Sequence, residues 1–196
     1  MTYFSELPLS GSYRTVYADP PWNETGAGVK GGRRGADRHY PLMKTRDIAA
    51  LPVPQVCASD AHLYLWITNS FLEDGLAVMR AWGFQYRTLL TWGKDRFGLG
   101  QYYRGQTEHV IFAVRGMLPY RHRPDGKRAQ GTTLVLGPRR EHSRKPEEMR
   151  RMIEVVSHPP YIELFSRGCA EGWDAWGNEP RAEIQASLGL MAGTPT

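Results

Sequence analysis

Short β-prone runs alternate with amphipathic stretches along this chain, and the alternation limits the folds that it can adopt. Strands are predicted at residues 13–18, 62–67, 86–92, 108–115, 133–136, 161–165 and 173–176. Helices are predicted at residues 45–51, at 70–82 and after residue 146. Ser70 and Glu73 match a capping box at the start of the second helix. This order is typical of an α/β fold, in which helices cover both faces of a sheet. Ligands of such sheets bind beyond the carboxyl ends of the strands, where Asp19 and Ser166 are expected.

Length, charge and cysteine content narrow the class of protein further. A chain of 196 residues suits one domain, which we place at residues 1–185, with a flexible tail at 186–196. The net charge of +5 and the pI of about 9.3 favour a polyanionic partner. Cys57 and Cys169 are too far apart in sequence to indicate a cysteine metal site, and the histidines show no ligand spacing, so no metal is expected. Because the chain has neither a secretion signal nor an apolar run of ~18 residues, we expect a soluble cytoplasmic protein with no membrane partner.

The most informative motif is Asp19-Pro20-Pro21-Trp22, which directly follows the first predicted strand. Proline fixes its own φ and holds the preceding residue extended, so the motif is rigid. Pro21 has no N–H, and we therefore expect the Pro20 carbonyl to remain uncapped by a local turn, beside the Asp19 carboxylate. Two such acceptors suit the two hydrogens of an exocyclic amine, and the carboxylate would stabilise positive charge that develops on its nitrogen. Trp22 would offer a face for stacking the base. Read alone, the motif fits equally well a proline-rich turn with a buried tryptophan.

Two weaker pieces follow later in the chain. Residues 161–168 predict a strand that runs into a glycine turn, and such a strand end can cradle a nucleoside. Residues 140–146 form a basic segment ahead of a helix, in which Lys145 is placed to pair with a carboxylate. Each piece alone is as well explained by an ordinary turn or by a solvated basic loop.

Taken together and in this order, these pieces resemble the MT-A70 family of adenine-N6 methyltransferases. The resemblance covers most of the chain and includes YADPPW (17–22), HYPLM (39–43), HLYLWITN (62–69), the run from Thr91 to Gly116, REHSRKPEEM (140–149) and YIELFSR (161–167). It implies a Rossmann-like methyltransferase sheet with a permuted motif order, the catalytic motif preceding the cofactor motif. It also implies S-adenosyl-L-methionine as the cofactor and N6 of adenine in a nucleic acid as the methyl acceptor.

The resemblance also assigns roles to individual residues. Asp19 and Pro20, with Pro21 in the same tetrapeptide, would hold the target amine between Trp22 and Tyr40. The residues that it assigns to the cofactor are Asp19, Lys145 at the methionine part, Phe165, and Arg167, Asn178 and Glu179 at the ribose and adenine. Glu163 would brace this pocket by pairing with Lys145 or Arg167.

Three basic loops, at residues 30–38, 121–128 and 139–145, favour contacts with backbone phosphates. The candidate residues are Arg33, Arg34, Arg38, Arg139, Arg140 and Arg144. DNA is favoured over RNA as the substrate. The alternatives are an RNA adenine-N6 methyltransferase, an N4-cytosine or small-molecule methyltransferase, and a catalytically inactive subunit that only binds nucleic acid. Because extruding a base costs a few kcal/mol, a domain of this size calls for a homodimer, a partner subunit or an already unpaired substrate.

Overall fold

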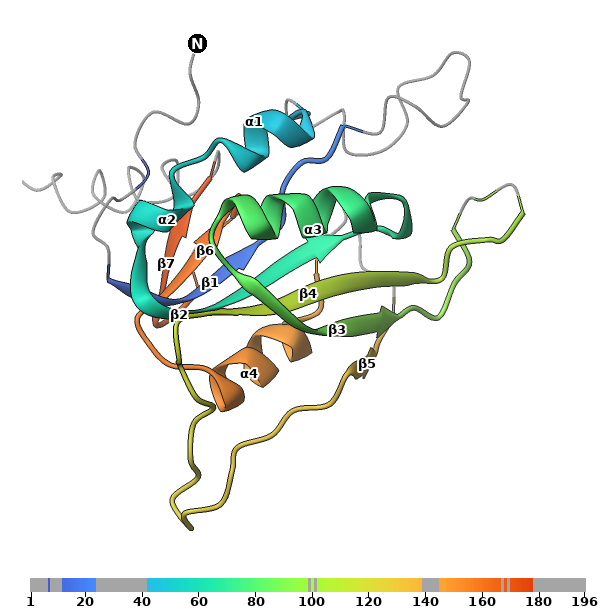
Figure 1. The fold of residues 1–196 in the computed structure, drawn as a ribbon. Coiled ribbons are helices and arrows are strands. Elements are labelled where there is room, and N and C mark those ends of the chain that lie inside the picture. The colour runs from blue at the N-terminus through green and yellow to red at the C-terminus, as the bar shows by residue number, and fades with distance from the viewer. Residues whose placement is uncertain are drawn as a thin grey trace, which may run out of the picture.

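A computed structural model describes residues 7, 12–23, 42–98, 100, 102–138, 145–166, 168 and 170–177 (Figure 1). The strands of the described part are β1 (Tyr13–Ala18), β2 (Cys57–Ile67), β3 (Gln85–Gly93), β4 (Thr107–Arg115), β5 (Leu134–Leu136), β6 (Tyr161–Leu164) and β7 (Trp173–Trp176). Its helices are α1 (Thr45–Ala49), α2 (Val53–Val56), α3 (Leu72–Ala81) and α4 (Glu147–Val156), with a 3₁₀ turn, η2, at Asn69–Phe71. The predicted tail at 186–196 lies outside the described residues.

All the strands join one sheet in the order β5-β3-β4-β2-β1-β6-β7. β1 pairs in parallel with β2 and β6, β6 with β7, and β3 with β5, whereas β4 is antiparallel to both β2 and β3. Every strand except β4 therefore runs in the same direction, and their carboxyl ends meet at one edge of the sheet. We call this the carboxyl edge.

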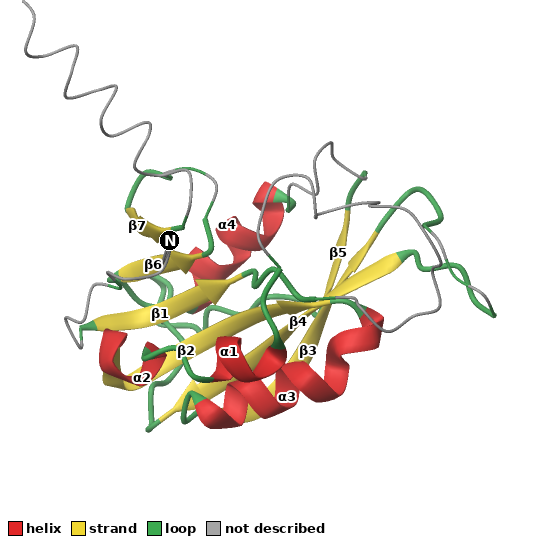
Figure 2. Cartoon of the chain, turned by 90° about the horizontal axis from the view of Figure 1, so that it is seen from above, coloured by secondary structure: helices red, strands yellow, loops and turns green. Residues whose placement is uncertain are grey.

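Side chains of successive residues in each strand point to opposite faces of the sheet, and each face has its own apolar core. From β2, Leu63 and Leu65 join the core under α1, α2 and α3, whereas Tyr64 and Trp66 join the core under α4. Figure 2 shows these two layers on either side of the strands. The predicted α/β fold with helices on both faces of one sheet is confirmed.

One local prediction about α3 is wrong and another is confirmed. The helix begins at Leu72 after the 3₁₀ turn, and its N-cap, Phe71, makes no side-chain cap hydrogen bond, so Ser70 and Glu73 do not form a capping box there. At the other end Gly83 adopts a φ of 79°, and the next N–H, of Phe84, donates to the Met79 carbonyl at 3.1 Å. This left-handed glycine ends the helix as its sequence position predicts.

The chain leaves the neighbouring strands β1 and β6 in opposite directions across the sheet. β1 leads through α1 and α2 to β2 on one side, whereas β6 leads to β7 on the other side. Neighbouring strands whose connections leave in opposite directions form a crevice at their carboxyl ends, which is the usual ligand site of such sheets. Asp19 follows β1 and Ser166 lies just beyond β6, so both lie at this crevice as expected.

Candidate active site

The Asp19-Pro20-Pro21-Trp22 motif forms a tight turn directly after β1. The backbone N–H of Asp19 still donates to the Leu164 carbonyl of β6, at 3.4 Å. The Trp22 N–H then reaches back to the Pro20 carbonyl at 2.9 Å. The expectation that this carbonyl stays uncapped is therefore wrong, because the donor comes from the residue after Pro21 rather than from Pro21 itself. A carbonyl oxygen has two lone pairs, so the Pro20 oxygen retains the capacity for a second donor.

Trp22 anchors the turn in the core. Its ring is stacked on Phe71 at 5.3 Å between centroids, and its indole N–H donates to the Trp66 carbonyl at 3.0 Å. Only 8% of the residue is exposed. The Met43 N–H donates to the Pro21 carbonyl at 2.8 Å and ties the turn to the segment before α1. Trp22 thus fixes the position of Asp19, and its stacking on a substrate base stays a prediction.

Lys145 joins Asp19 to a second carboxylate. Its ammonium lies 3.0 Å from Asp19 Oδ2 and 3.0 Å from Glu108 Oε2. Glu108 also accepts a hydrogen bond from Lys94, so four side chains form a row of alternating charge. Each is largely buried, from 16% exposure for the Lys94 side chain to 28% for that of Asp19. The row Asp19–Lys145–Glu108–Lys94, hereafter the charge row, lies along the carboxyl edge of the sheet.

The electrostatics of the charge row favour its ionised form. Burial acts to raise the pKa of the Glu108 carboxyl, but the charge of Lys145 and the hydrogen bond from Lys94 outweigh it and hold the pKa below its ordinary value. Burial likewise acts to lower the pKa of Lys145, but the carboxylates of Asp19 and Glu108 outweigh it and raise the pKa. The pKa shifts therefore keep the Glu108 carboxylate and the Lys145 ammonium charged, and that ammonium lies 3.0 Å from Asp19.

Aromatic rings form the floor under the two lysines. The Lys145 ammonium lies 4.9 Å from the Trp66 ring centroid, and that of Lys94 lies 4.7 Å from the Trp92 ring centroid. The indole N–H of Trp66 donates to the Tyr17 hydroxyl at 2.7 Å, in the core under α4. These cation–π contacts hold the two ammonium groups against an apolar layer.

Glu163 does not pair with Lys145, contrary to one of the two expectations for it. Its carboxylate is bound by Arg150, which projects from α4 over β6. Burial raises the pKa of Glu163 despite the opposing charge of Arg150, and the Asp19 carboxylate raises it further. Glu163 therefore braces the α4 side of the site, with a partner that sequence reasoning did not propose.

The turn after β6 is compact. Phe165 has a φ of 62°, a left-handed conformation that is rare outside glycine, and its ring meets Trp176 edge to face at 5.5 Å. The Ser166 hydroxyl donates to the Gly168 carbonyl at 2.6 Å. A Cβ on Gly177 would lie 2.2 Å from the Ser166 carbonyl oxygen, so only glycine allows the chain after β7 to approach so closely. Backbone strain and close approach of this kind concentrate at ligand sites.

The remaining candidate residues lie outside the described part of the chain. They are Arg33, Arg34, Arg38, Tyr40, Arg139, Arg140, Arg144, Arg167, Asn178 and Glu179. The structure brings Asp19 and Lys145 into contact, with Pro20 and Pro21 in the same turn and with Glu163 and Phe165 on the neighbouring strand end. Of the three basic loops, 121–128 lies away from the site. Arg121 contacts the C-terminal end of α4, at the edge opposite to the carboxyl edge.

Sequence reasoning missed two residues of the site, Glu108 and Lys94. The sequence does contain a signal for them, in the two predicted strands on either side of the loop at residues 94–106. An antiparallel hairpin that pairs Trp92 with Glu108, as the structure does, puts Lys94 and Glu108 close together where the hairpin leaves the sheet. A buried carboxylate beside two lysines at a strand end is typical of a functional site.

Two kinds of feature are absent from the described residues. They contain no group of three or more histidine, cysteine, aspartate or glutamate side chains that could hold a metal ion. In the same part of the chain, no helix is long and apolar enough to cross a membrane.

The fold and the site together define a class. An α/β sheet with its crevice between β1 and β6, and a carboxylate held at the end of β1 by a rigid diproline turn, is the arrangement of a Rossmann-like methyltransferase. The comparisons with known proteins identify the family within that class.

The family model of MT-A70 matches residues 13–179. The chain is 31% identical to the type II methyltransferase M.MunI of a Mycoplasma species, over 90% of this chain and 81% of that protein. It is 27% identical to an MT-A70-like N(6)-adenosine-methyltransferase of Arabidopsis thaliana and 26% identical to the human N(6)-adenosine-methyltransferase catalytic subunit METTL3. Those alignments cover 95% and 90% of this chain but only 26% and 30% of the plant and human proteins. The chain belongs to the MT-A70 family and is a methyltransferase of the adenine-N6 type.

Proposed function

We propose that this protein transfers a methyl group from S-adenosyl-L-methionine to N6 of adenine in DNA. The observation that carries the proposal is the Asp19 carboxylate, held at the carboxyl end of β1 by the Lys145 ammonium at 3.0 Å. DNA is preferred to RNA because the relative of comparable length is named a type II methyltransferase. The relatives named N(6)-adenosine-methyltransferases are much longer, since this chain spans only 26% to 30% of them.

The residues at the crevice fit the proposed cofactor. S-adenosyl-L-methionine, when bound, supplies a methyl group on a positively charged sulfur. Its amino-acid part carries a carboxylate, which Lys145 would hold, and a positive charge, to which the nearby Asp19 carboxylate would add only a minor share of the binding. The strained turn at Phe165 and the close backbone approach at Gly177 suit its nucleoside part, to which the resemblance also assigns Arg167, Asn178 and Glu179.

The chemistry at the acceptor amine follows from Asp19 and Pro20. The Asp19 carboxylate and the second lone pair of the Pro20 oxygen accept the two amine hydrogens, which localises the nitrogen lone pair for attack. As the nitrogen–methyl bond forms and the methyl–sulfur bond breaks, positive charge would develop on the nitrogen, and the fixed carboxylate would stabilise that transition state more than the ground state. A neutral thioether would leave, and the nitrogen would then lose one proton along its hydrogen bond to Asp19. Pro20 and Pro21 hold both acceptors in place before the substrate arrives, so little reorganisation is needed.

Glu108 affects how much negative charge the Asp19 carboxylate presents to the amine, because both carboxylates share Lys145. Lys145 is shared between Asp19 and Glu108 at equal distances of 3.0 Å, so its charge does not act on Asp19 alone. Asp19 is therefore neutralised less than it would be in a one-to-one pair with a lysine. We assign Glu108 and Lys94 to positioning Lys145, and Asp19 to direct contact with the amine.

A nucleic-acid-binding subunit without activity is the alternative from another class. The intact turn from Asp19 to Trp22 and the charge row argue against this alternative, because binding of nucleic acid alone does not require a carboxylate held in this position.

Because extruding adenine from a duplex costs a few kcal/mol, the isolated chain is proposed to favour unpaired or mismatched DNA. Efficient methylation of matched duplex would then need a homodimer or a partner subunit.

The decisive experiment compares N6-methyladenine formation, measured by mass spectrometry, on matched duplex DNA, single-stranded DNA and RNA of one sequence. Asp19→Asn should lower the rate by roughly 10²–10³-fold, with cofactor binding by calorimetry largely retained. Asp60→Asn is the matched control, since Asp60 lies at the opposite edge, where its carboxylate accepts the Met117 N–H at 2.6 Å. An Asp19→Asn rate within a few-fold of wild type would contradict the catalytic assignment, and faster methylation of RNA would overturn the choice of DNA.

The cofactor pocket has a separate test. Lys145→Ala and Asn178→Ala should each weaken S-adenosyl-L-methionine binding in calorimetry, because each removes a polar partner of the proposed pocket. Unchanged affinity in both variants would place the pocket elsewhere on the sheet.

A further inference from the structure

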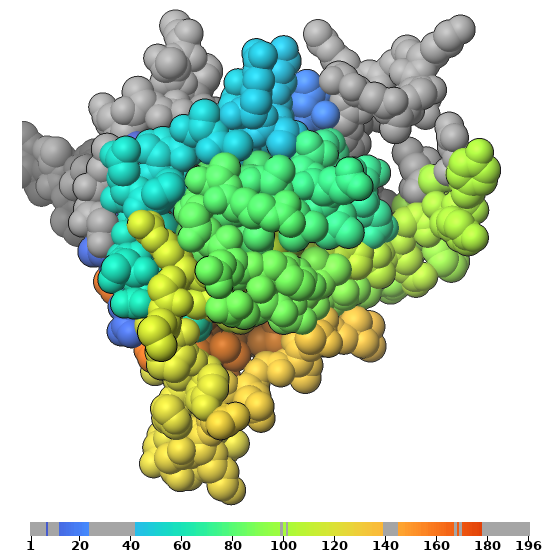
Figure 3. Space-filling model, viewed as in Figure 1, coloured from blue at the N-terminus to red at the C-terminus, as the bar shows by residue number. Residues whose placement is uncertain are grey.

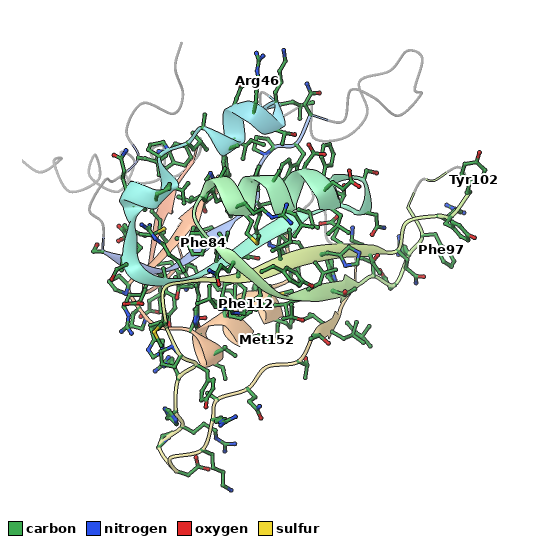
Figure 4. All side chains as sticks on the ribbon, in the orientation of Figure 1. Arg46, Phe84, Phe97, Tyr102, Phe112 and Met152 are labelled. Atoms are coloured by element: carbon green, nitrogen blue, oxygen red, sulfur yellow. The ribbon has the colours of Figure 1, made fainter. Side chains whose placement is uncertain are left out.

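The loop between β3 and β4 exposes three aromatic rings that pack against little of the protein. Its described residues are 94–98, 100 and 102–106, and we call them the aromatic loop. Tyr102 is 93% exposed, Tyr103 92% and Phe97 60%. Figure 4 shows Phe97 and Tyr102 at the far end of this loop, pointing away from the body of the protein. Large exposed aromatic residues gathered on one loop mark an interaction site.

The aromatic loop has a defined backbone that presents these rings outward. The Gly98 N–H donates to the Gly105 carbonyl at 2.6 Å and closes the loop across its middle. At the tip, a Cβ on Gly100 would lie 1.9 Å from the Tyr103 carbonyl oxygen, so the chain turns more tightly there than any side chain permits. The tight turn leaves the consecutive side chains of Tyr102 and Tyr103 in solvent.

Two arginines, Arg96 and Arg104, flank the aromatic residues of the aromatic loop. The Arg104 guanidinium lies 5.7 Å from the Phe97 ring centroid, and its Nε–H donates to the Gly98 carbonyl at 3.0 Å. The Arg96 side chain is 81% exposed, and its Nε lies 3.9 Å from the carboxylate of Asp95. Exposed aromatic rings interleaved with arginine are typical of surfaces that bind single-stranded nucleic acid, where bases stack on the rings and phosphates meet the cations.

The position of the aromatic loop ties it to the active site. It leaves the sheet at Lys94 and returns toward Glu108, two members of the charge row that holds Lys145 beside Asp19. The Lys94 N–H donates to the Gln106 carbonyl at 2.9 Å, and this hydrogen bond closes the base of the aromatic loop. Figure 3 shows the loop as a knob that projects from the body at this end of the sheet. The base of the aromatic loop therefore lies next to the site that the target adenine would enter, and its tip projects outward from the body, toward the neighbouring nucleotides of a bound strand (Figure 4).

We propose that Tyr102 and Tyr103 stack on unpaired bases that neighbour the target adenine in the nucleic-acid strand. Extruding the adenine breaks its stacking with its neighbours, and the two rings would replace part of that stacking. The choice of an unpaired strand rests on the proposed function, but the binding measurement below does not depend on methylation. The Arg96 guanidinium would contact a backbone phosphate beside these bases.

The test measures binding of a fluorescent single-stranded oligonucleotide by anisotropy, with the full chain. Tyr102→Leu/Tyr103→Leu keeps apolar bulk but removes both ring faces, and should weaken binding by at least about tenfold. Tyr102→Phe/Tyr103→Phe keeps the rings and should bind within about twofold of wild type. Met117→Ala/Val155→Ala is the control for exposed apolar bulk at the opposite edge of the sheet, since these residues are 90% and 50% exposed, and it should bind as wild type does. Arg96→Gln should lower the slope of log affinity against log salt by about 0.7.

The outcomes separate this inference from the proposed function. Tyr102→Leu/Tyr103→Leu binding equal to wild type overturns the inference, whether or not the protein methylates DNA. A change in the size of the protein in solution, with unchanged oligonucleotide affinity, also overturns it and identifies the loop as a protein interface. A wild-type protein that binds no single strand overturns it as well. Conversely, a tenfold weaker affinity of this variant, in a protein that makes no N6-methyladenine, supports the stacking role and refutes only the proposed reaction.

Discussion

Glu108→Gln removes one of the two carboxylates that hold Lys145, while keeping the shape and the hydrogen-bonding capacity of the side chain. In the wild type, the charge row contains two ammonium groups and two carboxylates and is neutral overall. The variant leaves two ammonium groups with one carboxylate, in a place where every side chain is at most 28% exposed. We therefore expect the substitution to destabilise the fold.

The magnitude follows from the distance. Two unit charges 3.0 Å apart, the separation of Lys145 from Glu108, attract by about 5–6 kcal/mol at an effective dielectric constant of about 20, before any cost of desolvation. Removing one partner of a fully buried pair costs ~3–5 kcal/mol. Because these side chains retain some exposure and glutamine still accepts a hydrogen bond, we expect the free energy of unfolding to fall by about 2–3 kcal/mol.

Urea unfolding at pH 7 measures this change, and Lys94→Met supplies the matched control. That substitution alone leaves two carboxylates with one ammonium and should also destabilise, whereas the double variant restores neutrality around Asp19 and Lys145. The coupling energy between the two changes should be about 1–2 kcal/mol, so that the double variant is more stable than the sum of the two single effects predicts. Strict additivity would refute the charge row as an energetic unit.

A pH series gives an independent check. The folded pKa of Glu108 lies below its ordinary value, because Lys145 and Lys94 outweigh the burial that would raise it. A depressed carboxyl pKa contributes stability above the unfolded pKa, about 4.5, and this stability disappears as the pH falls through the folded pKa. The difference between wild type and Glu108→Gln should therefore shrink below about pH 4.5, and a difference that stays constant down to about pH 3 would contradict this account.

Three further outcomes are expected. Gly177→Ala should destabilise the fold by about 1–3 kcal/mol in urea unfolding, because the new Cβ would lie 2.2 Å from a backbone oxygen; a change below about 0.5 kcal/mol would mean that the turn relaxes at little cost. Burial lowers the pKa of His62, so the unfolded chain takes up the proton first and stability should fall as the pH drops below about 6.5; His62→Gln should flatten that part of the profile. Replacing Arg33, Arg34 and Arg38 together by alanine should reduce the salt slope of duplex binding by roughly 0.9 for each phosphate that these arginines neutralise, and an unchanged slope would assign them to the fold or to solubility.

The buried neutral state expected for His62 follows from its partners. Its Nε2 faces the Leu118 carbonyl at 3.0 Å, and a carbonyl only accepts, so the ring proton must be on Nε2. Its Nδ1 is then the acceptor for the Ser157 hydroxyl at 2.8 Å. Protonation of Nδ1 would break this hydrogen bond in a residue that is 2% exposed, which gives the expected decrease in stability at low pH its structural cause.

The strands were predictable from sequence because their signals are local. β1 and β7 have the predicted bounds, and the alternation of side chains in β2 specifies which residues enter each core. The end of α3 was equally predictable, since a left-handed turn there requires Gly83. The start of that helix was not. A capping-box pattern at Ser70 and Glu73 carries no information about the 3₁₀ turn that precedes the helix in the structure.

The candidate site was predictable only in part, because its pairings depend on the fold. Asp19 and Lys145 were proposed separately, and their contact needs β1 and the start of α4 to meet at one edge. The contact of Glu163 with Arg150 was not proposed, because Arg150 lies one turn inside α4, which packs over β6 only in the assembled sheet. The expectation of an uncapped Pro20 carbonyl was wrong for a simpler reason. The backbone N–H that donates to this carbonyl belongs to Trp22, the second residue after Pro20, and not to Pro21.

The reversed strand β4 explains why two features that sequence reasoning did not connect occur at the same place. A strand antiparallel to its neighbours begins at the edge where they end, so the first residues of β4, with Glu108, lie beside the end of β3 and Lys94. A parallel strand in that position would have ended there instead and placed Glu108 at the opposite edge of the sheet. The same reversal makes the connection from β3 to β4 a hairpin at the carboxyl edge, so the aromatic loop with the exposed rings of Tyr102 and Tyr103 leaves the sheet beside the charge row. The reversed direction of β4 thus places two features at the carboxyl edge. One is the Glu108 carboxylate, which shares Lys145 with Asp19, and the other is the aromatic loop, which is proposed to bind the nucleotides next to the target base.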